Sequence, residues 1–508
     1  MAELPIWDTL VFILYLLLIL GFGVSFSFRK RTAKDFTTGG GRLPAWAIGM
    51  SIFATFVSSI SFLALPGNAY LGNWNGFVFS LSIPFAGWIA VRFFVPHYRS
   101  ISSDSAYFYL EERFGPWARI YASTCYLLTQ LARMGAILYL LALPMHFLFG
   151  WSIAWVIALT GLIVVIYAML GGIEAVVWTD AIQGLILIGG AIICLGMIFW
   201  KIPGGASQLL EVADTNEKFS LGSFDWDFGS STFWMILVYG LFINLQNFGI
   251  DQSYVQRYIT AKSDQDAKRS TWLGSLLYIP VSALFFLIGT ALFGFYQTQP
   301  YLLPEGIQAD SVFPHFIVSE LPIGLTGLLI ASLFAAGMST LSTSINSSAT
   351  VILSDHVKKY LNPNLPAKSD LNVLRISSLA MGLLAILVGL AFNGVSSALD
   401  AWWALASIFS GGILGLFLLG IVVKTCPGKY AAFATLVGVL LIAWVSLSPI
   451  LMENEGAKPI WLSSFHPNMS IVQGTAGIFL VGFLLTLAFQ KKNNMTIRDV
   501  ARMGRQPQ

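Results

Sequence analysis

The feature that most constrains this chain is a series of long apolar segments that recurs from one end of the sequence to the other. About 20 residues of helix cross the hydrocarbon core of a bilayer, and each segment reaches about that length. A membrane barrel would need short segments that alternate between polar and apolar residues, so we predict an all-α polytopic membrane protein. We predict thirteen spans, at residues 9–28, 44–70, 76–96, 120–149, 152–170, 179–200, 232–254, 272–296, 323–354, 373–392, 400–423, 430–450 and 471–490.

Composition supports this class and argues against several others. Only 10% of the residues are charged, against about 25% in soluble domains, and the mean hydropathy is +0.74. The three cysteines and five histidines are scattered, so we predict no metal centre and no cofactor. No nucleophile–base pair can be assembled from the sequence, which argues against an enzyme.

Basic residues predict the orientation, because cytoplasmic connections are enriched in Lys and Arg. With the N-terminus outside, the inside connections and the C-terminal tail hold 23 of the 28 basic residues, and the outside connections hold only Lys201, Lys218 and Lys458. The first span follows an acidic flank, "MAELPIWD", and is therefore not expected to be a signal peptide. The net charge of +3 follows from topology, and we predict no nucleic-acid partner.

Two of the predicted spans contain features that interrupt helices. The span at 44–70 combines hydroxyl residues with a Pro66–Gly67 break, and the span at 232–254 contains Asn244, Gly249 and Asp251. Interrupted helices at corresponding positions of two halves are typical of transporters with inverted repeats. We therefore predict the following organisation: an extra helix and loop (1–43), a first five-helix repeat (44–200), an extracytoplasmic loop (201–231), a second five-helix repeat (232–424), two further helices (425–490) and a cytoplasmic tail (491–508).

The stretch "AGMSTLSTSINSSAT", residues 336–350, places many hydroxyl groups inside an apolar span. On a helix, Ser339 shares a face with Ser342 and Thr343. Such oxygens suit a sodium ion, and freed carbonyls near Ala54 and Val57 of the interrupted span would complete its coordination. Small hydroxyl residues also allow helices to pack closely, so the sequence leaves both interpretations open.

Asp180 lies just inside the sixth predicted span. A charge at that depth costs about 3 kcal/mol or more, so it needs a partner or a function. A sodium ion held between Asp180 and the hydroxyls of Ser342 and Thr343 would be such a partner, and an interfacial helix-capping acid is the alternative.

Arg133 is the only basic residue near the middle of a predicted span. Its planar guanidinium suits a carboxylate, which would come from an anionic solute or from a structural ion pair with Asp180 or Asp251. For Asp251 itself we expect a structural or gating pair with Arg257.

Five motifs resemble the sodium/solute symporter family, and within it the bacterial sodium/sialic acid symporters. They are "DFTTGGGRLPAWAIGMSIFATFVSSISF", "SAYFYLEERFG", "YAMLGGIEAVVWTDAIQG", "DQSYVQRYITAKS" and "FAAGMSTLSTSINSSAT". The resemblance implies a LeuT-type five-plus-five inverted repeat in a bacterial inner membrane. It also implies a sodium site common to the family at Ala54, Val57, Ala336, Ser339 and Thr340, and a second sodium site at Asp180, Ser339, Ser342 and Thr343.

The same resemblance implies a solute site formed by Phe56, Ser58, Ser61, Gly76, Ser80, Arg133 and Phe248. The sialic acid symporters have Thr, Phe and Gln where this chain has Phe56, Gly76 and Ser80, which changes the shape of the pocket and removes an amide donor. We predict a symporter that imports a small carboxylate-bearing solute, sialic acid or a related sugar acid, with two sodium ions. The alternatives are a symporter of a neutral sugar, amino acid or monocarboxylate and, from another class, a solute sensor or passive channel.

Overall fold

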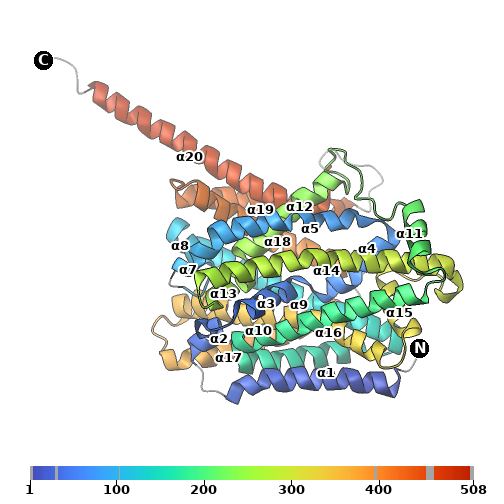
Figure 1. The fold of residues 1–508 in the computed structure, drawn as a ribbon. Coiled ribbons are helices and arrows are strands. Elements are labelled where there is room, and N and C mark those ends of the chain that lie inside the picture. Colours follow the sequence, from blue (N-terminus) through green and yellow to red (C-terminus); the bar gives the residue numbers. More distant parts are fainter. Residues whose placement is uncertain (1–3, 29–31, 102, 394–397, 453–462, 504–508) are drawn as a thin grey trace. The chain divides into compact units, whose positions relative to one another are not determined.

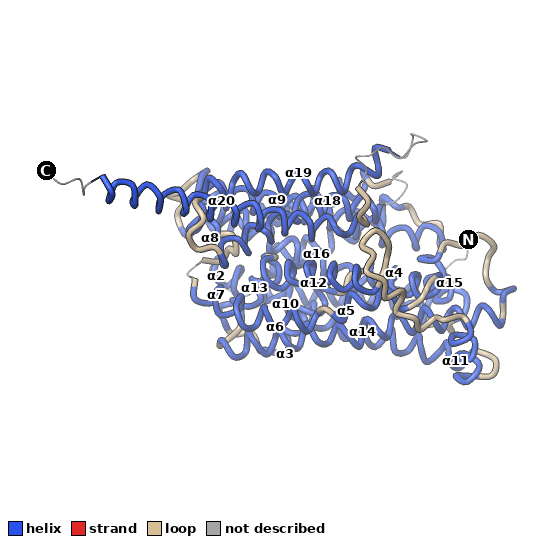
Figure 2. The backbone as a smooth tube through the Cα atoms, turned by 90° about the horizontal axis from the view of Figure 1, so that it is seen from above, coloured by secondary structure: helices blue, strands red, loops and turns tan. Residues whose placement is uncertain are grey.

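The computed structural model describes residues 4–28, 32–101, 103–393, 398–452 and 463–503. This part of the chain is helical and contains no strand, apart from a single bridge between Leu43 and Ala261 (Figures 1 and 2). The predicted all-α class is confirmed. The helices are α1 (Ile6–Ser25), α2 (Ala33–Thr38), α3 (Ala45–Phe56), α4 (Ser59–Leu71), α5 (Val78–Leu81), α6 (Ile83–Ile89), α7 (Val95–Ser100), α8 (Phe108–Phe114), α9 (Pro116–Phe149), α10 (Ile153–Lys201), α11 (Gly205–Thr215), α12 (Phe233–Ile250), α13 (Gln252–Thr260), α14 (Asp264–Thr298), α15 (Ala309–Glu320), α16 (Leu325–Val351), α17 (Ala367–Ala391), α18 (Ala398–Val422), α19 (Gly428–Met452) and α20 (Ser470–Met503).

Within the described residues, ten helical segments are long and apolar enough to cross a membrane, or eleven when the bent pair α3 and α4 counts as one span. Two of the thirteen predicted spans, 152–170 and 179–200, lie within α10, a single element of 49 residues. A straight helix of that length would be about 74 Å long, more than twice the thickness of the hydrocarbon core. Gly172 breaks it, with φ 57° and ψ −162°, so the chain turns between two membrane-length segments.

The first interrupted span breaks at a different position from the predicted one. Helices α3 and α4 meet at 59°, and Val57 and Ser58 between them are extended. Pro66 lies inside α4, so the expected break at Pro66–Gly67 is wrong. The carbonyl of Pro66 lies against Gly289 of α14, where an added Cβ would come within 2.2 Å of it. A proline is tolerated within a membrane helix when neighbouring elements pack against the altered backbone.

The second interruption is where the sequence predicts it. Helix α12 ends at Ile250, Asp251 is extended with φ −74° and ψ 124°, and α13 begins at Gln252. The side chain of Asp251 accepts a hydrogen bond from the Ser253 amide, which caps the new helix. A second helix N-terminus, that of α13, therefore lies inside the predicted span at 232–254.

The chain divides into two compact units, of which residues 1–106 and 127–403 form the first. Its central element is α16, in which every residue from Leu329 to Val351 is buried. Helices α1, α3, α4, α10 and α17 pack against it. The hydroxyl-rich stretch of α16 therefore faces protein along its whole length.

Residues 107–126 and 404–508 form the second unit. Helices α19 and α20 pack closely here. Gly438 allows this approach, since an added Cβ at that position would lie 2.2 Å from the Ile478 side chain. The guanidinium of Arg113 donates to the Gly420, Val423 and Cys426 carbonyls at 3.3, 2.6 and 3.1 Å. These bonds satisfy carbonyls that the end of α18 leaves open.

The predicted loop at 201–231 is ordered and contains α11. Its Lys218 is 3% exposed and donates to the carbonyls of Tyr70 and Gly72, at the end of α4 that lies away from the break. The ammonium also lies 3.8 Å from the centre of the Phe293 ring, and burial lowers the pKa of Lys218. These contacts hold the loop against the end of α4, which is the second half of the broken span.

Several predicted features lie outside the described residues. They are Arg29, Lys30, Arg31 and Lys458, which contribute to the orientation argument, and the last five residues of the tail, 504–508.

Substituting Gly172 tests the kink inside α10. We expect Gly172→Ala to lower the melting temperature of the detergent-solubilised protein, because φ is positive and the new Cβ would lie 2.9 Å from Phe36 Cα. Strain and overpacking of this kind each cost about 1–3 kcal/mol. The matched control is Gly189→Ala on the same element, where no atom lies within 4 Å of the added Cβ. Equal melting temperatures for the two variants would contradict the assigned turn.

Candidate ion and solute site

The break between α3 and α4 places backbone carbonyls beside the hydroxyl-rich part of α16. Ser339 Oγ donates to Ala54 O at 2.9 Å and to Ala336 O at 3.1 Å, and Thr340 Oγ1 donates to Ala336 O at 3.3 Å. Val57 is 1% exposed at the break itself. The residues predicted for the common sodium site thus lie on the two elements that meet here, and their oxygens are the hard, mostly neutral ligands that sodium prefers.

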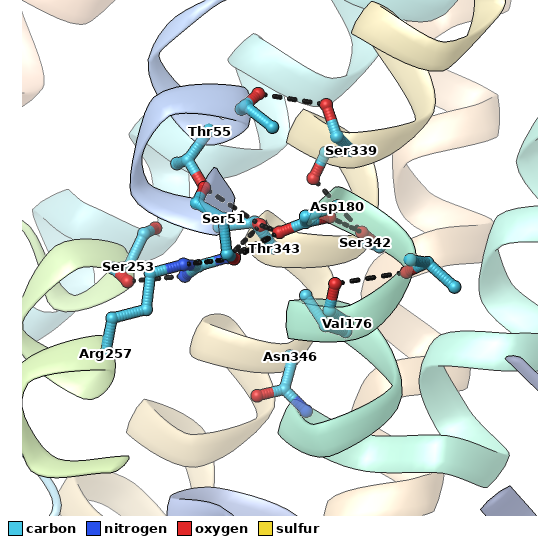
Figure 3. A network of polar contacts seen from close by, with 12 residues as sticks. Ser51, Thr55, Val176, Asp180, Ser253, Arg257, Ser339, Ser342, Thr343 and Asn346 are labelled. Carbon is cyan, nitrogen blue, oxygen red and sulfur yellow. Dashed lines mark hydrogen bonds and ion pairs between the residues drawn. The ribbon is translucent and has the colours of Figure 1, made fainter. Parts of the chain in front are cut away.

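A second polar cluster surrounds Asp180, which is fully buried in α10 (Figure 3). Its Oδ2 accepts from Ser51 Oγ at 2.6 Å, from Arg257 Nη2 at 2.8 Å and from Thr343 Oγ1 at 3.2 Å. Its Oδ1 accepts from Ser342 Oγ at 3.3 Å. Four helices, α3, α10, α13 and α16, contribute to this cluster. The alternative of an interfacial capping acid is wrong, because Asp180 lies inside a helix and away from solvent.

Arg257 contacts Asp180 and Thr343, two of the four residues that we expected to hold a sodium ion at this cluster. Its guanidinium donates to Ser51 Oγ at 2.7 Å, to Ser253 O at 2.6 Å and to Thr343 Oγ1 at 2.5 Å, in addition to Asp180. The side chain is fully buried. The buried carboxylate is therefore neutralised by the protein's own cation in this structure.

The predicted pair between Asp251 and Arg257 is wrong, since Arg257 pairs with Asp180 instead. Side chains on one helix meet when they are three or four positions apart, and these two residues are six apart. Asp251 uses its carboxylate to cap α13. The partner of Arg257 comes from α10, which sequence spacing could not indicate.

Arg133 lies in α9, where its Nη2 donates to Thr55 O at 3.2 Å, close to the end of α3. Among the described residues it has no ion pair, so neither Asp180 nor Asp251 is its salt-bridge partner. Gln130, one turn earlier, donates to Asp251 Oδ2 at 3.4 Å and accepts from Ser344 Oγ at 2.7 Å. Gln130 was not among the predicted site residues, although an amide one turn before the arginine of an apolar helix was the available signal.

The predicted solute residues gather around an aromatic cluster. The Phe56 ring stacks on Phe248 at 5.6 Å and meets Tyr278 edge-on at 4.4 Å. The hydroxyl of Tyr278, a residue that sequence analysis missed, lies beside the hydroxyls of Ser61 and Ser282.

The remaining predicted solute residues lie at this break or against α14. Ser80 donates to Ser282 at 2.9 Å, and an added Cβ on Gly76 would lie 3.0 Å from the Phe286 ring. Ser58 is buried within the break between α3 and α4. Gly76 and Ser80 thus lie against α14, whereas Phe56 and Ser58 lie at the break itself.

The fold and the site together define a multi-pass membrane transporter in which two broken helices surround buried polar groups. Residues 36–438 match the sodium:solute symporter family, and the chain belongs to that family. It is 36% identical to the sodium/sialic acid symporter SiaT of Proteus mirabilis, over 84% of this chain and 87% of that protein. It is 33% identical to the sodium/sialic acid symporter NanT of Aliivibrio fischeri, over 96% and 94% of the two chains.

Comparison with a solved structure agrees with this family assignment. The substrate-bound, outward-open state of a Na+-coupled sialic acid symporter superposes with a TM-score of 0.87 at 33% identity, over 95% of this chain and 98% of that one. At this identity the likeness covers sequence as well as fold over nearly the whole chain.

Replacing Arg257 tests the electrostatic role of the buried pair. We expect Arg257→Met to destabilise the protein in sodium-free buffer by about 3–5 kcal/mol, because it leaves a buried carboxylate without its cation. The control is Arg42→Met, whose partner Asp35 is 3.3 Å away and whose side chain is 75% exposed. Loss of such a surface pair costs about 0–1 kcal/mol. Melting curves in N-methylglucamine buffer measure the difference, and similar curves would argue against a charged Asp180.

Proposed function

We propose that this protein imports a small carboxylate-bearing solute together with sodium, and that sialic acid is the first solute to test. The observation that carries the proposal is Arg133, a half-buried arginine with no ion pair in the described part of the chain, which lies beside the broken span. A guanidinium in this situation is suited to bind a carboxylate through two parallel hydrogen bonds. The two relatives named for sodium/sialic acid symport support the choice of solute.

We assign the common sodium site to Ala54, Val57, Ala336, Ser339 and Thr340. The hydrogen bonds that join Ser339 to Ala54 and Ala336 support this assignment, since they bring hydroxyl and carbonyl oxygens within about 3 Å of each other. The site contains no formal charge, which suits a monovalent ion that must be released in each cycle.

We assign the second site to Asp180, Ser339, Ser342 and Thr343. The contacts of Ser342 and Thr343 with the Asp180 carboxylate support it. A sodium ion there would share Asp180 and Thr343 with Arg257, which contacts Asp180 Oδ2 and leaves Oδ1 to Ser342. The solved relative, whose structure is described as revealing a novel Na+-site, supports the presence of more than one sodium site in such proteins.

The transport cycle follows from these two sodium sites and one monoanionic solute. Each cycle moves one net positive charge inward, which is worth about 2.3 kcal/mol per 100 mV, in addition to two sodium gradients. Rocking of a helix bundle around a fixed site would alternate access, as in transporters with inverted repeats. Division of α10 at Gly172 and the inclusion of α18 support thirteen spans. We keep the repeats at 44–200 and 232–424, with the N-terminus outside and the C-terminus inside as the basic residues predict.

A second solute class is a smaller monocarboxylate, and Phe56 favours it. Its ring packs against Phe248 and Tyr278 next to Ser58 and Ser61, so it occupies volume in the proposed pocket. A solute without the bulky side chain of sialic acid would need less of that volume. A passive channel or a solute sensor would not accumulate any solute against its gradient.

Uptake into proteoliposomes tests the proposed solute. We expect labelled N-acetylneuraminic acid to accumulate only with an inward sodium gradient and to accumulate faster with an inside-negative potential. Arg133→Ala should raise its half-saturating concentration at least tenfold, because the carboxylate loses a charged bidentate partner. Arg133→Lys is the control, because it keeps the positive charge and loses the planar guanidinium that binds a carboxylate through two hydrogen bonds. Sodium-independent uptake, or unchanged kinetics in the alanine variant, would contradict the proposal.

The sodium dependence of uptake tests the second site. Wild-type uptake should depend on sodium with a Hill coefficient well above 1, and Asp180→Asn should reduce it towards 1, because one of two coupled ions is lost. Thr340→Ala is the matched variant, because Thr340 is assigned to the common sodium site and not to the second sodium site. A Hill coefficient that stays the same in the Asp180→Asn protein would remove Asp180 from the sodium ligands.

A further inference from the structure

We propose that a third cation position lies between Asp180 and the side of the protein predicted to be cytoplasmic, and that the amide of Gln256 closes it. Its ligands are three oxygens: Thr37 O, Asn346 Oδ1 and Thr350 Oγ1. The inference rests on the proposed function and orientation, and it makes this position a transient stop for sodium that leaves the Asp180 site inward. None of the three ligands belongs to the two assigned sodium sites.

Three acceptor oxygens from two helices converge on one amide nitrogen at this position. Gln256 Nε2 of α13 donates to the carbonyl of Thr37, which belongs to α2, at 2.7 Å. It also lies 2.9 Å from Asn346 Oδ1 and 3.0 Å from Thr350 Oγ1, both on α16. An amide NH2 group has two hydrogens, so the three acceptors must share them. The oxygens therefore surround a single point of partial positive charge, which is also how oxygens surround a small cation.

Within the described part of the chain, the same cluster leaves two buried polar atoms without a hydrogen-bond partner. They are Gln256 Oε1 and Asn346 Nδ2. Buried side-chain polar atoms are normally paired, and an exception needs an explanation such as a bound ion or water. The terminal torsion of a glutamine is broad and roughly two-fold, so a turn of the Gln256 amide exchanges Nε2 for Oε1. Four oxygens then face one another, which is favourable only with a cation between them.

A row of buried hydroxyl groups joins this position to the Asp180 cluster. Thr343, which contacts Asp180, lies one turn before Ser347, whose Oγ donates to the Thr343 carbonyl at 2.8 Å. Ser347 Oγ lies 3.2 Å from Ser253 Oγ of α13, and Thr350 follows three positions later on the same face of α16. Thr343 and Thr350 are therefore about 10 Å apart along the helix axis. Every residue between them is buried.

The position lies on the side of the Asp180 cluster from which sodium would leave the protein. In Figure 3, Asn346 lies on the opposite side of Asp180 from Ser339, the residue shared by the two assigned sodium sites. Further along, Thr37 Oγ1 donates to Asp104 Oδ2 at 2.8 Å. Asp104 belongs to the connection after α7, which the basic residues predict to be cytoplasmic. A sodium ion that moves inward from Asp180 would therefore meet this ring of oxygens.

The orientation of the Gln256 amide gives the position two states. With Nε2 toward the three oxygens, the amide takes the place of a cation and the path is closed. With Oε1 toward them, the amide adds a fourth oxygen and the ring can hold sodium. All four ligands are neutral, so the ion is held less strongly than beside the Asp180 carboxylate, as a transient stop requires.

Gln252, one turn earlier on α13, is a buried amide without these features. Its Nε2 donates to the carbonyl of Asp104 at 2.6 Å, and its Oε1 accepts from the Ala106 amide at 2.8 Å. Both ends of that amide are paired, so it holds the connection after α7 in place. The unpaired oxygen and shared nitrogen of Gln256 are therefore not a general property of buried amides on this helix.

The first measurement replaces the closing amide with a carboxylate. In detergent without solute, sodium replaces N-methylglucamine at constant ionic strength, and the melting temperature reports sodium binding. We expect Gln256→Glu to lower the half-saturating sodium concentration about tenfold, because a buried carboxylate among three oxygens requires a cation. The matched control is Gln252→Glu, which buries the same charge without the converging oxygens and should not gain sodium affinity. If Gln256→Glu does not fold, Asn346→Asp replaces only the unpartnered Nδ2 and should show the same gain.

The second measurement separates sodium release from a structural defect. With saturating sodium on both sides of a proteoliposome, exchange of N-acetylneuraminic acid does not require sodium to leave the protein, whereas net uptake does. Gln256→Glu should slow net uptake about tenfold and leave exchange within about twofold of wild type, because a charged ring releases the ion slowly. A structural defect would reduce both rates alike.

Three results would overturn the third cation position. They are an unchanged sodium affinity in the Gln256→Glu or Asn346→Asp protein, an equal gain in Gln252→Glu, and a parallel loss of uptake and exchange. If wild-type protein does not transport this acid, the proposed solute fails, while the sodium titration still decides the third position.

Discussion

The buried ion pair between Arg257 and Asp180 is the interaction around which the centre of this protein is organised. It joins α10 to α13, and through Ser51 and Thr343 it also connects α3 and α16. Such a pair contributes little to stability, because the desolvation of two charges offsets most of their attraction. A well-packed apolar core would serve the fold equally well. Stability alone therefore gives no reason for a buried ion pair at this position.

The two helix breaks determine where these charges can lie. Unpaired backbone groups are tolerated at membrane depth only when they line a cavity or contact other polar groups. At Val57–Ser58 the freed carbonyls meet the hydroxyls of α16, and at Asp251 the chain begins a new helix whose N-terminus is capped by a carboxylate. Each break thus supplies one half of the proposed site: neutral oxygens from the first, and the Asp251–Arg257 segment from the second.

Much of this arrangement follows from the sequence, and the exceptions have physical causes. The hydroxyl stretch of α16 and the acid at 180 are recognisable because polar groups are costly in hydrocarbon, and the structure brings Ser342 and Thr343 to Asp180. The partner of Arg257 was not predictable, because a contact between α10 and α13 depends on tertiary packing. Pro66 was misleading for the same reason, since α14 packs against the backbone at that proline and α4 remains helical. The break at Gly172 lies within the predicted connection between the spans at 152–170 and 179–200, although its positive φ leaves no trace in the hydropathy of the surrounding residues.

The proposed ion and solute functions rest on different parts of the molecule. The groups around Asp180 come from α3, α10, α13 and α16, whereas Phe56 and Ser80 contact residues of α14, among them Tyr278 and Ser282. A substitution at Phe56 or Tyr278 can therefore change the volume and polarity of the solute pocket without altering the charges that balance sodium. Helix α9 contacts both parts: Arg133 donates to the Thr55 carbonyl next to Phe56, and Gln130, one turn earlier, donates to Asp251. Under the proposed function, this division of roles would allow the residues around Phe56 to determine which solute fits while the cluster around Asp180 keeps its oxygens for sodium.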